Sequence, residues 1–442
     1  MLQTSNPKVH ILGAGPAGLA AGYYAKKHNI PFHIFESTSS YGGNCRTIID
    51  GEFRYDTGAH RLHDKIRKVT NEVKFLMGDE LQLVNSPSKI IKDNHFIDFP
   101  LTIPSLFNYM NKYQIKDIIL ENFMNLFSKG ELHNFKDFAY AKYGPTLSEL
   151  FLINYTEKLW GLNSELLHKQ VAGDRLNNLG AISILKKMIF KDRKAKHLDG
   201  SFYYPKKGFG TIFDKVVEYI GIENISFNSP IRKIMVNKNR ITRIFYGQKS
   251  YFNARNVINT LPLDFVFKIM RPKPIPRILE GMDSIKFRKL RLCILFLDIP
   301  YVTNNASLYF PESSIPITRV YEPKNRSNLM APKNKTCLIA EIPCSENDKV
   351  YHLSPSKLSN LVKNILIEHD LFKSNVISKM KTINLENAYP ILAADHYNLL
   401  KDARLFLRNF RNNYMFGRNA EFRYIHTHNI FEKAEIIIKS IV

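Results

Sequence analysis

Cysteine is scarce in this chain, and tryptophan occurs once, at Trp160. No two of the four cysteines have Cys-x-x-Cys spacing; they are Cys45, Cys293, Cys337 and Cys344. Their spacing argues against a redox disulfide and against a zinc knuckle. We therefore expect free, mostly buried thiols in a reducing compartment, and no metal site.

Long apolar runs are also missing. No stretch approaches the roughly 20 apolar residues of a membrane-spanning helix, and the amino end shows no basic segment followed by an apolar one. We expect no transmembrane segment and a cytoplasmic location. The 442 residues, 44% of them hydrophobic, suffice for a substantial core in two domains or in one large interleaved pair.

Acidic residues are in the minority, because 63 lysines and arginines stand against 40 aspartates and glutamates and give a net charge of +23. Such an excess attracts anionic partners, and a nucleotide-sugar, a nucleic acid and an anionic membrane are the alternatives. The basic residues are dispersed, which favours compositional drift over a binding patch. No nucleic-acid-binding motif is present, so we do not expect nucleic acid as a partner.

The first 36 residues carry a dinucleotide-binding pattern. An apolar run at 9–12 predicts a strand, Gly-Ala-Gly-Pro-Ala-Gly follows at 13–18, and a helical pattern leads to a second apolar run ending on Glu36. This is the GxGxxG fingerprint within a strand-helix-strand unit. The glycines make a tight turn and admit a pyrophosphate to the helix N-terminus, while the acid suits ribose hydroxyls. The predicted cofactor contacts are Gly13, Gly15, Pro16, Ala17, Gly18 and Glu36.

Two further blocks specify the dinucleotide. Residues 41–47 read Tyr-Gly-Gly-Asn-Cys-Arg-Thr, and residues 53–63 read Phe-Arg-Tyr-Asp-Thr-Gly-Ala-His-Arg-Leu-His. A glycine pair allows a second close approach to the pyrophosphate. Together the three blocks resemble the flavoprotein superfamily of amine oxidases, protoporphyrinogen oxidases and UDP-galactopyranose mutases. The resemblance implies FAD as the cofactor, with contacts from Gly42, Gly43, Asn44, Arg46, Gly58, Ala59 and His60.

The carboxyl end adds a fourth block, Phe-Gly-Arg-Asn-Ala-Glu-Phe-Arg-Tyr at residues 416–424. It resembles a glycine-arginine motif of the same families. The resemblance implies cofactor contacts from Gly417, Arg418 and Tyr424, and an adenine contact from the backbone near Ile231. Those families usually carry an aspartate shortly after the tyrosine, whereas this chain has His426, Thr427 and His428 there.

Strings in the middle of the chain suggest where a substrate binds. Tyr-Thr-Glu-Lys-Leu-Trp-Gly at 155–161, Phe-Arg-Lys-Leu-Arg at 287–291 and Thr-Arg-Val-Tyr-Glu-Pro-Lys at 318–324 resemble strings of the mutases and their oxidase relatives. The implied substrate residues are Trp160, Arg175 and Arg291, with Arg288 and Arg319 as candidates to face an anionic substrate. For each arginine a surface charge is the alternative, and for the tryptophan a place in the core.

The predicted fold class is α/β. A Rossmann-type FAD-binding domain of the glutathione-reductase kind, at 1–100, 196–265 and 386–442, is expected to interleave with a mixed α+β substrate domain at 101–195 and 266–385. Within the helical part, the pattern predicts one helix over 147–160, ended by Gly161 as a C-cap.

Two reactions compete. In an oxidoreductase of the amine-oxidase or protoporphyrinogen-oxidase type, the flavin N5 accepts a hydride from a small-molecule substrate. In a nucleotide-sugar mutase, the reduced flavin attacks the anomeric carbon, with His60, His63, Arg288 and Arg319 as the catalytic set. A non-catalytic flavin-binding scaffold is the third alternative. The sequence leaves the substrate and the oligomeric state open.

Overall fold

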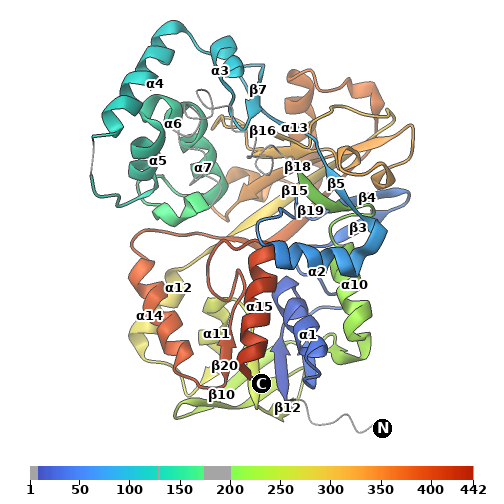
Figure 1. The fold of residues 1–442 in the computed structure, drawn as a ribbon, viewed down its shortest axis with the longest axis vertical. Coiled ribbons are helices and arrows are strands. Elements are labelled where there is room, and N and C mark those ends of the chain that lie inside the picture. Colours follow the sequence, from blue (N-terminus) through green and yellow to red (C-terminus); the bar gives the residue numbers. More distant parts are fainter. Residues whose placement is uncertain (1–7, 128–129, 174–200, 442) are drawn as a thin grey trace.

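The computed structural model describes residues 8–127, 130–173 and 201–441 (Figure 1). Arg175, a predicted substrate residue, lies outside this range. Within it, no helix is both long and apolar enough to cross a membrane. The lower half of the molecule in Figure 1 holds both chain ends, and the helical part and a large sheet lie above it.

A five-stranded parallel sheet forms the base of the fold. Its order is β20-β13-β1-β2-β9, and all four pairings are parallel. These strands are short and mostly buried, as expected of a parallel sheet covered by helices. Their bounds are β20 Asn413–Met415, β13 Asn256–Asn259, β1 Val9–Leu12, β2 Phe32–Phe35 and β9 Ile225–Ser226. The helices around them are α1 Pro16–Lys27, α2 Arg67–Met77, α10 Thr211–Ile220 and α15 Thr427–Ile441.

A seven-stranded sheet forms the second layer, in the order β19-β15-β18-β17-β16-β6-β7. The bounds are β19 Ile377–Pro390, β15 Phe287–Leu297, β18 Thr336–Cys344, β17 Arg319–Tyr321, β16 Ser307–Tyr309, β6 Ser88–Lys92 and β7 His95–Phe99. The apolar run at β15 is central, between β18 and β19. Helix α13 Pro355–Glu368 packs against β15 and β19.

Three strands pair across the predicted segment boundaries. Strands β6 and β7 fall within segment 1–100, yet they pair in the seven-stranded sheet rather than with β1. Strand β14 Met270–Arg271 falls within segment 266–385, yet it joins the sheet β12-β11-β10-β14. Main-chain pairing between segments distant in sequence decides both placements. The division into two discontinuous domains otherwise stays a prediction.

The helical part contains α3 Ile103–Tyr109, α4 Lys112–Asn125, α5 Phe135–Tyr143, α6 Pro145–Phe151 and α7 Ile153–Trp160. The expectation of one helix over 147–160 is wrong, because the helix is interrupted at Leu152, whose φ is −110°. The predicted C-cap is confirmed, since Gly161 adopts the left-handed conformation at φ +72°.

The remaining elements complete the two layers. The four-stranded sheet consists of β10 Ile231–Asn237, β11 Arg240–Tyr246 and β12 Ser250–Asn253 together with β14. Two antiparallel two-stranded sheets are the hairpin of β3 Thr47–Asp50 with β4 Phe53–Asp56, and the long-range pair of β5 Leu81–Val84 with β8 Phe202–Pro205. The further helices are α11 Leu263–Ile269, α12 Pro276–Ser284 and α14 Tyr397–Arg408.

Asp56, at the end of β4, joins the two layers. Its buried carboxylate accepts hydrogen bonds from the hydroxyls of Thr47 and Tyr204 and from the amide of Phe209. Its carbonyl accepts the hydroxyl of Tyr321, from the large sheet, at 2.6 Å. Burial raises the pKa of this carboxyl. The arrangement fixes the start of the 57–63 loop between the layers.

Candidate functional site

The glycine fingerprint forms a tight turn between β1 and α1. Gly13 has φ +101° and its amide donates to the Phe35 carbonyl at 2.8 Å. A Cβ at Gly18 would lie 1.8 Å from the Gly13 carbonyl oxygen, so only glycine fits there. A Cβ at Gly15 would meet no protein atom within 4 Å. The backbone at Gly15 is therefore open on one side, as a pyrophosphate site requires.

The later glycine blocks meet the same turn. The amide of Gly42 donates to the Ala14 carbonyl at 2.8 Å, and a Cβ at Gly43 would lie 3.2 Å from the Cα of Gly15. From the carboxyl end, a Cβ at Gly417 would lie 2.9 Å from that of Ala17. Three stretches distant in sequence thus present glycine backbone at one place beside Pro16.

Polar groups around this turn suit a dinucleotide. Glu36, at the end of β2, accepts the amide of Ala14 at 2.8 Å and the amide of Thr38 at 2.9 Å, which holds its carboxylate beside the turn. The Nε of Arg46 is buried and has no hydrogen-bond partner among the described residues. An unpaired buried donor next to a glycine loop fits a phosphate ligand. The amide of Ser229 donates to the Glu36 carbonyl at 2.7 Å, which brings the segment before Ile231 to the same edge.

A cavity of about 540 Å³ opens between the two layers. Many predicted site residues line it: Asn44, Gly58, Ala59, His60, His63, Arg319, Arg418 and Tyr424. His426 and His428, which stand where the related families carry an aspartate, line it as well. Unpredicted residues also line it, including Arg61, Lys65, Leu290 and Tyr389. The cavity is of ligand size, and its charged side chains are mostly basic.

His60 is a neutral group in this cavity. Its Nε2 lies 3.0 Å from the Asn44 carbonyl, and a carbonyl can only accept, so Nε2 carries the proton. Burial, together with the charge of Arg418, lowers the pKa of His60 to about 3. The neighbouring Cys45 thiol stays protonated, because burial raises its pKa to about 12.

The apoprotein is expected to lose stability on acidification partly through His60. Its pKa is 6.5 in the unfolded chain and about 3 in the fold, so below pH 6.5 the unfolded state binds the extra proton. Stability from this group is complete above about pH 6.5 and falls by about 2 kcal/mol towards about pH 5. Urea unfolding across this range checks the slope. We expect His60→Gln to flatten it and exposed His95→Gln to leave it unchanged. An unchanged slope in His60→Gln contradicts the assignment.

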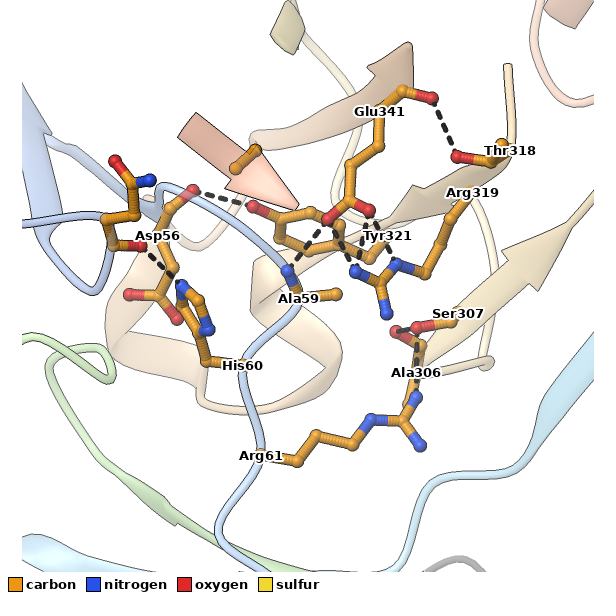
Figure 2. Close-up of polar contacts among 12 residues, drawn as sticks. Asp56, Ala59, His60, Arg61, Ala306, Ser307, Thr318, Arg319, Tyr321 and Glu341 are labelled. Atoms are coloured by element: carbon orange, nitrogen blue, oxygen red, sulfur yellow. Dashed lines mark hydrogen bonds and ion pairs between the residues drawn. The ribbon is translucent and has the colours of Figure 1, made fainter. Parts of the chain in front are cut away.

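Arg319 is held by a buried carboxylate. Glu341, directly opposite on β18, accepts Nε of Arg319 at 2.9 Å and its NH2 group at 2.8 and 2.6 Å. Its Oε1 also accepts the amide of Ala59 at 2.9 Å (Figure 2). Glu341 is 2% exposed. One carboxylate therefore neutralises Arg319 and ties the large sheet to the loop that carries His60.

The structure does not bring Arg288 and Arg291 to the cavity. Arg288 is buried, with NH1 donating to Asp348 at 2.5 Å and to the Ser345 hydroxyl at 2.6 Å. Arg291 is equally buried, and its NH1 donates to main-chain carbonyls at 350, 351 and 353. Both guanidinium groups hold the sheet to the following loop, so the predicted contact with an anionic substrate has no geometric support at either position.

Trp160 lies behind the cavity wall rather than in it. Its ring is 3% exposed and makes edge contacts with Tyr389 at 6.1 Å and Tyr424 at 5.8 Å between centroids. These tyrosines line the cavity, and the guanidinium of Arg418 lies 4.7 Å above the Tyr424 ring. Trp160 therefore packs behind the two tyrosines of the cavity wall, and Arg418 lies over the ring of one of them, Tyr424.

Arg61 and Lys158 are two further residues that sequence reasoning did not select. Arg61 reaches from the His60 loop to the Ser307 hydroxyl at 2.9 Å (Figure 2). It also donates to the Ser88 hydroxyl at 3.1 Å. Lys158 donates to four carbonyls of residues 310–317, at 2.6 to 2.9 Å, and so fixes the loop before Arg319. Arg61 belongs to the family-like block at residues 53–63, and this position was the sequence signal that could have identified it.

Comparison with known families matches residues 150–370, half of the chain, to UDP-galactopyranose mutase. The chain belongs to the UDP-galactopyranose mutase family. Residues 11–73 also match an NAD(P)-binding Rossmann-like domain, which covers the glycine turn and the His60 loop. The predicted fold class and the flavoprotein superfamily are confirmed.

Two curated relatives match short stretches of the chain. A hydroxysqualene dehydroxylase of Sinorhizobium fredii is 34% identical over 82 residues, which is 18% of this chain and 19% of that protein. A mitochondrial protoporphyrinogen oxidase of Nicotiana tabacum is 33% identical over 67 residues, 15% of this chain and 13% of that protein. The matched stretches thus span less than a fifth of either relative.

Two solved structures share the fold over nearly the whole chain. A reduced UDP-galactopyranose mutase superposes with a TM-score of 0.81 at 19% identity, covering 98% of this chain and 93% of the other. A protein described as a protoporphyrinogen oxidase, from Exiguobacterium, gives 0.78 at 16% identity and 99% coverage of both. The family members are flavin-dependent enzymes, so this protein is an enzyme and its cofactor is FAD.

Proposed function

We propose that this enzyme is an FAD-dependent oxidoreductase that acts on a small molecule in the cavity between the two layers. The observation that carries the proposal is that the side chains of the candidate arginines already bind acceptor groups of the protein. Arg288 and Arg291 donate to protein acceptors outside the cavity, and Arg319 is neutralised by Glu341. A mutase needs cationic groups for a diphosphate leaving group, and these three positions do not offer free ones.

The residues of the chain divide the work between cofactor and substrate. Gly13, Gly15 and Gly18, with Gly43 and Arg46, would hold the pyrophosphate of FAD, and the loop at 58–60 would lie beside its ring. Bound FAD supplies a two-electron acceptor, to which a substrate C–H bond can give a hydride while the adjoining O–H or N–H gives its proton to water.

The cavity wall orients the substrate and holds protons in place. Neutral His60, fixed through Nε2 to the Asn44 carbonyl, adds no positive charge at neutral pH. Tyr389 and Tyr424, backed by Trp160, offer flat apolar surface and hydroxyl groups. The aromatic wall and Leu290 suit a partly apolar substrate, because most small-molecule sites are apolar with a few polar groups.

The test is anaerobic reduction of the oxidised holoenzyme by a panel of amines, tetrapyrroles and hydroxylated lipids, followed by flavin absorbance. A substrate is expected to bleach the flavin without added reductant. His63→Ala, in the cavity, is expected to slow bleaching by about tenfold or more, and exposed His95→Ala is the matched control. Bleaching that is equal in both variants contradicts the placement of the substrate in this cavity.

The second candidate is a nucleotide-sugar mutase, and the family match over 150–370 favours it. The basic cavity residues Arg61, Lys65 and Arg418 are compatible with an anionic substrate. The discriminating experiment compares the oxidised enzyme with dithionite-reduced enzyme, each incubated with UDP-galactose. Isomerisation by the reduced half alone supports the mutase and overturns the oxidoreductase proposal.

A further inference from the structure

The ammonium group of Lys158 lies among main-chain oxygens that all come from one loop. Its Nζ donates to the carbonyls of Phe310, Glu312, Ile315 and Ile317, at 2.6, 2.8, 2.8 and 2.9 Å. We call these four carbonyls the 310–317 cage. An ammonium group has three hydrogens, so it cannot give each of four acceptors a separate hydrogen bond. Part of the attraction is therefore that of a positive charge beside four carbonyl dipoles. Main-chain carbonyls hold K⁺ in channel filters in this way, by replacing the hydration shell of the ion.

The 310–317 cage belongs to the loop between two strands of the seven-stranded sheet. Strand β16 ends at Tyr309, and β17 begins at Arg319. The charge held by the cage therefore fixes the course of the chain directly before Arg319. Arg319 in turn binds Glu341, which also accepts the amide of Ala59 at the cavity.

The same side chain joins this loop to helix α7. Lys158 stands two positions before Trp160, the last residue of α7, whose ring packs behind the tyrosines of the cavity wall. The main-chain carbonyl of Lys158 accepts NH2 of Arg288, on the central strand β15, at 3.2 Å. Helix α7 also packs against β18, and in Figure 1 it lies where the helical part meets the large sheet. Lys158 thus connects two elements that support the cavity from behind.

We propose that the 310–317 cage is a monovalent-cation site whose occupant in this chain is the ammonium group of Lys158. The lysine is a positioning residue, because it holds the loop before Arg319 and the end of α7 around one positive charge. Once its side chain is removed, the cage is expected to bind a free K⁺ or ammonium ion. This inference goes beyond the proposed function and does not depend on which reaction the cavity supports.

The loop that forms the cage also borders a surface cavity of about 420 Å³. Residues 312–314 line this cavity together with Asn154, which stands one helical turn before Lys158 on α7. An ion from solvent can therefore come close to the loop without unfolding of the sheet. The charged side chains of this surface cavity are of both signs, so cation selection rests on the carbonyl oxygens of the cage, which can only accept.

The test compares two substitutions that remove the same charge. Lys158→Ala leaves the space of the lysine stem open, whereas Lys158→Met fills it with an apolar side chain. The FAD-loaded variants are melted in the chlorides of potassium, ammonium or tetramethylammonium at equal ionic strength. Burial lowers the pKa of Lys158 to about 7, against the attraction of the Glu312 carboxylate. The comparison is therefore made at about pH 6, where the native side chain is charged.

In the tetramethylammonium salt, whose cation is too large for the cage, both variants are expected to melt at least about 3 °C below the native chain. K⁺ or ammonium is expected to restore at least about half of this loss in Lys158→Ala, with an effect that rises with concentration. Neither ion is expected to restore Lys158→Met or to change the native chain.

Trp160, the only tryptophan of the chain, reports the position of α7 below the melting temperature. Its fluorescence emission is expected to shift to longer wavelength in Lys158→Ala and to return when K⁺ is added, while the emission of Lys158→Met stays shifted. A role in stability alone would not make the tryptophan environment of the folded variant depend on the cation.

Three results overturn the proposal: a native chain that responds to K⁺ as Lys158→Ala does, two variants that respond alike, or no loss of stability in either variant. If Lys158→Ala does not fold in the absence of a small cation, its refolding yield replaces the melting temperature as the measure. Equal yields in the potassium and tetramethylammonium salts, including no refolding in both, then decide against the site.

Discussion

Gly15→Ala is expected to abolish FAD binding while leaving the apoprotein folded. A Cβ at this position meets no protein atom within 4 Å, and the residue has φ −73°, which alanine adopts without strain. The methyl group would instead occupy the open side of the turn, where the pyrophosphate must approach the backbone. We expect flavin content after reconstitution to fall by at least tenfold, or about 1.4 kcal/mol or more of binding free energy. Absorbance of the dialysed protein measures it.

Gly18→Ala is the comparison that distinguishes an effect on cofactor binding from an effect on folding. Here the Cβ would lie 1.8 Å from the Gly13 carbonyl oxygen, so the turn itself must shift, and the apoprotein is expected to melt at a lower temperature. Gly130→Ala, exposed and with open space around its Cβ, is the neutral control. If Gly15→Ala retained normal flavin content, the pyrophosphate would not lie at this turn and the assignment of the cofactor site would be wrong.

Local signals were sufficient to predict the glycine turn on which the proposed nucleotide half of the site rests. Gly13, Gly15 and Gly18 could be assigned to a tight turn from the sequence, because the short GxGxxG spacing between a strand and a helix allows one backbone geometry. The later glycines at 42–43 and 417 carry the same kind of local constraint. Their convergence on one turn follows from the parallel order of β20, β13, β1 and β2, in which the carboxyl ends of the strands share an edge.

The substrate half could not be predicted in the same way. The sequence of a family-like string does not distinguish an arginine whose guanidinium faces a ligand from one whose guanidinium binds a carboxylate of the protein. Arg288 meets Asp348 in the loop after β18, and Arg319 meets Glu341 on the neighbouring strand, so both pairings depend on the three-dimensional fold rather than on sequence spacing. Glu341 did leave a signal, since it is the sole charged residue in the otherwise uncharged strand 336–344. A lone acid in such a strand predicts a buried ionic partner.

Glu341→Ala is expected to destabilise the enzyme by about 3–5 kcal/mol, because it leaves the Arg319 guanidinium buried without its counter-charge. The pair is bidentate and Glu341 is 2% exposed, so solvent cannot replace the lost carboxylate. The amide of Ala59 loses its acceptor at the same time. Urea unfolding of the apoprotein measures the change, and the midpoint is expected to move without a change of slope.

Asp98→Ala is the matched control for this cost. Asp98 pairs with Lys89 directly across β6 and β7 of the same sheet, but the two side chains are 37% and 29% exposed. Removal of a half-exposed partner is expected to cost less than about 1 kcal/mol. Equal losses in the two variants would mean that burial does not distinguish the pairs.

The double variant Glu341→Leu, Arg319→Met tests the reason for the loss. With both charges gone, the site becomes apolar, and the double variant is expected to recover most of the stability that Glu341→Ala loses. The Ala59 amide still lacks its acceptor, so recovery should stop short by about 1 kcal/mol. A double variant as unstable as Glu341→Ala would show instead that the carboxylate acts mainly through the His60 loop. Arg319 would then be a secondary partner, free to turn towards an anionic substrate, and the case against the mutase would weaken.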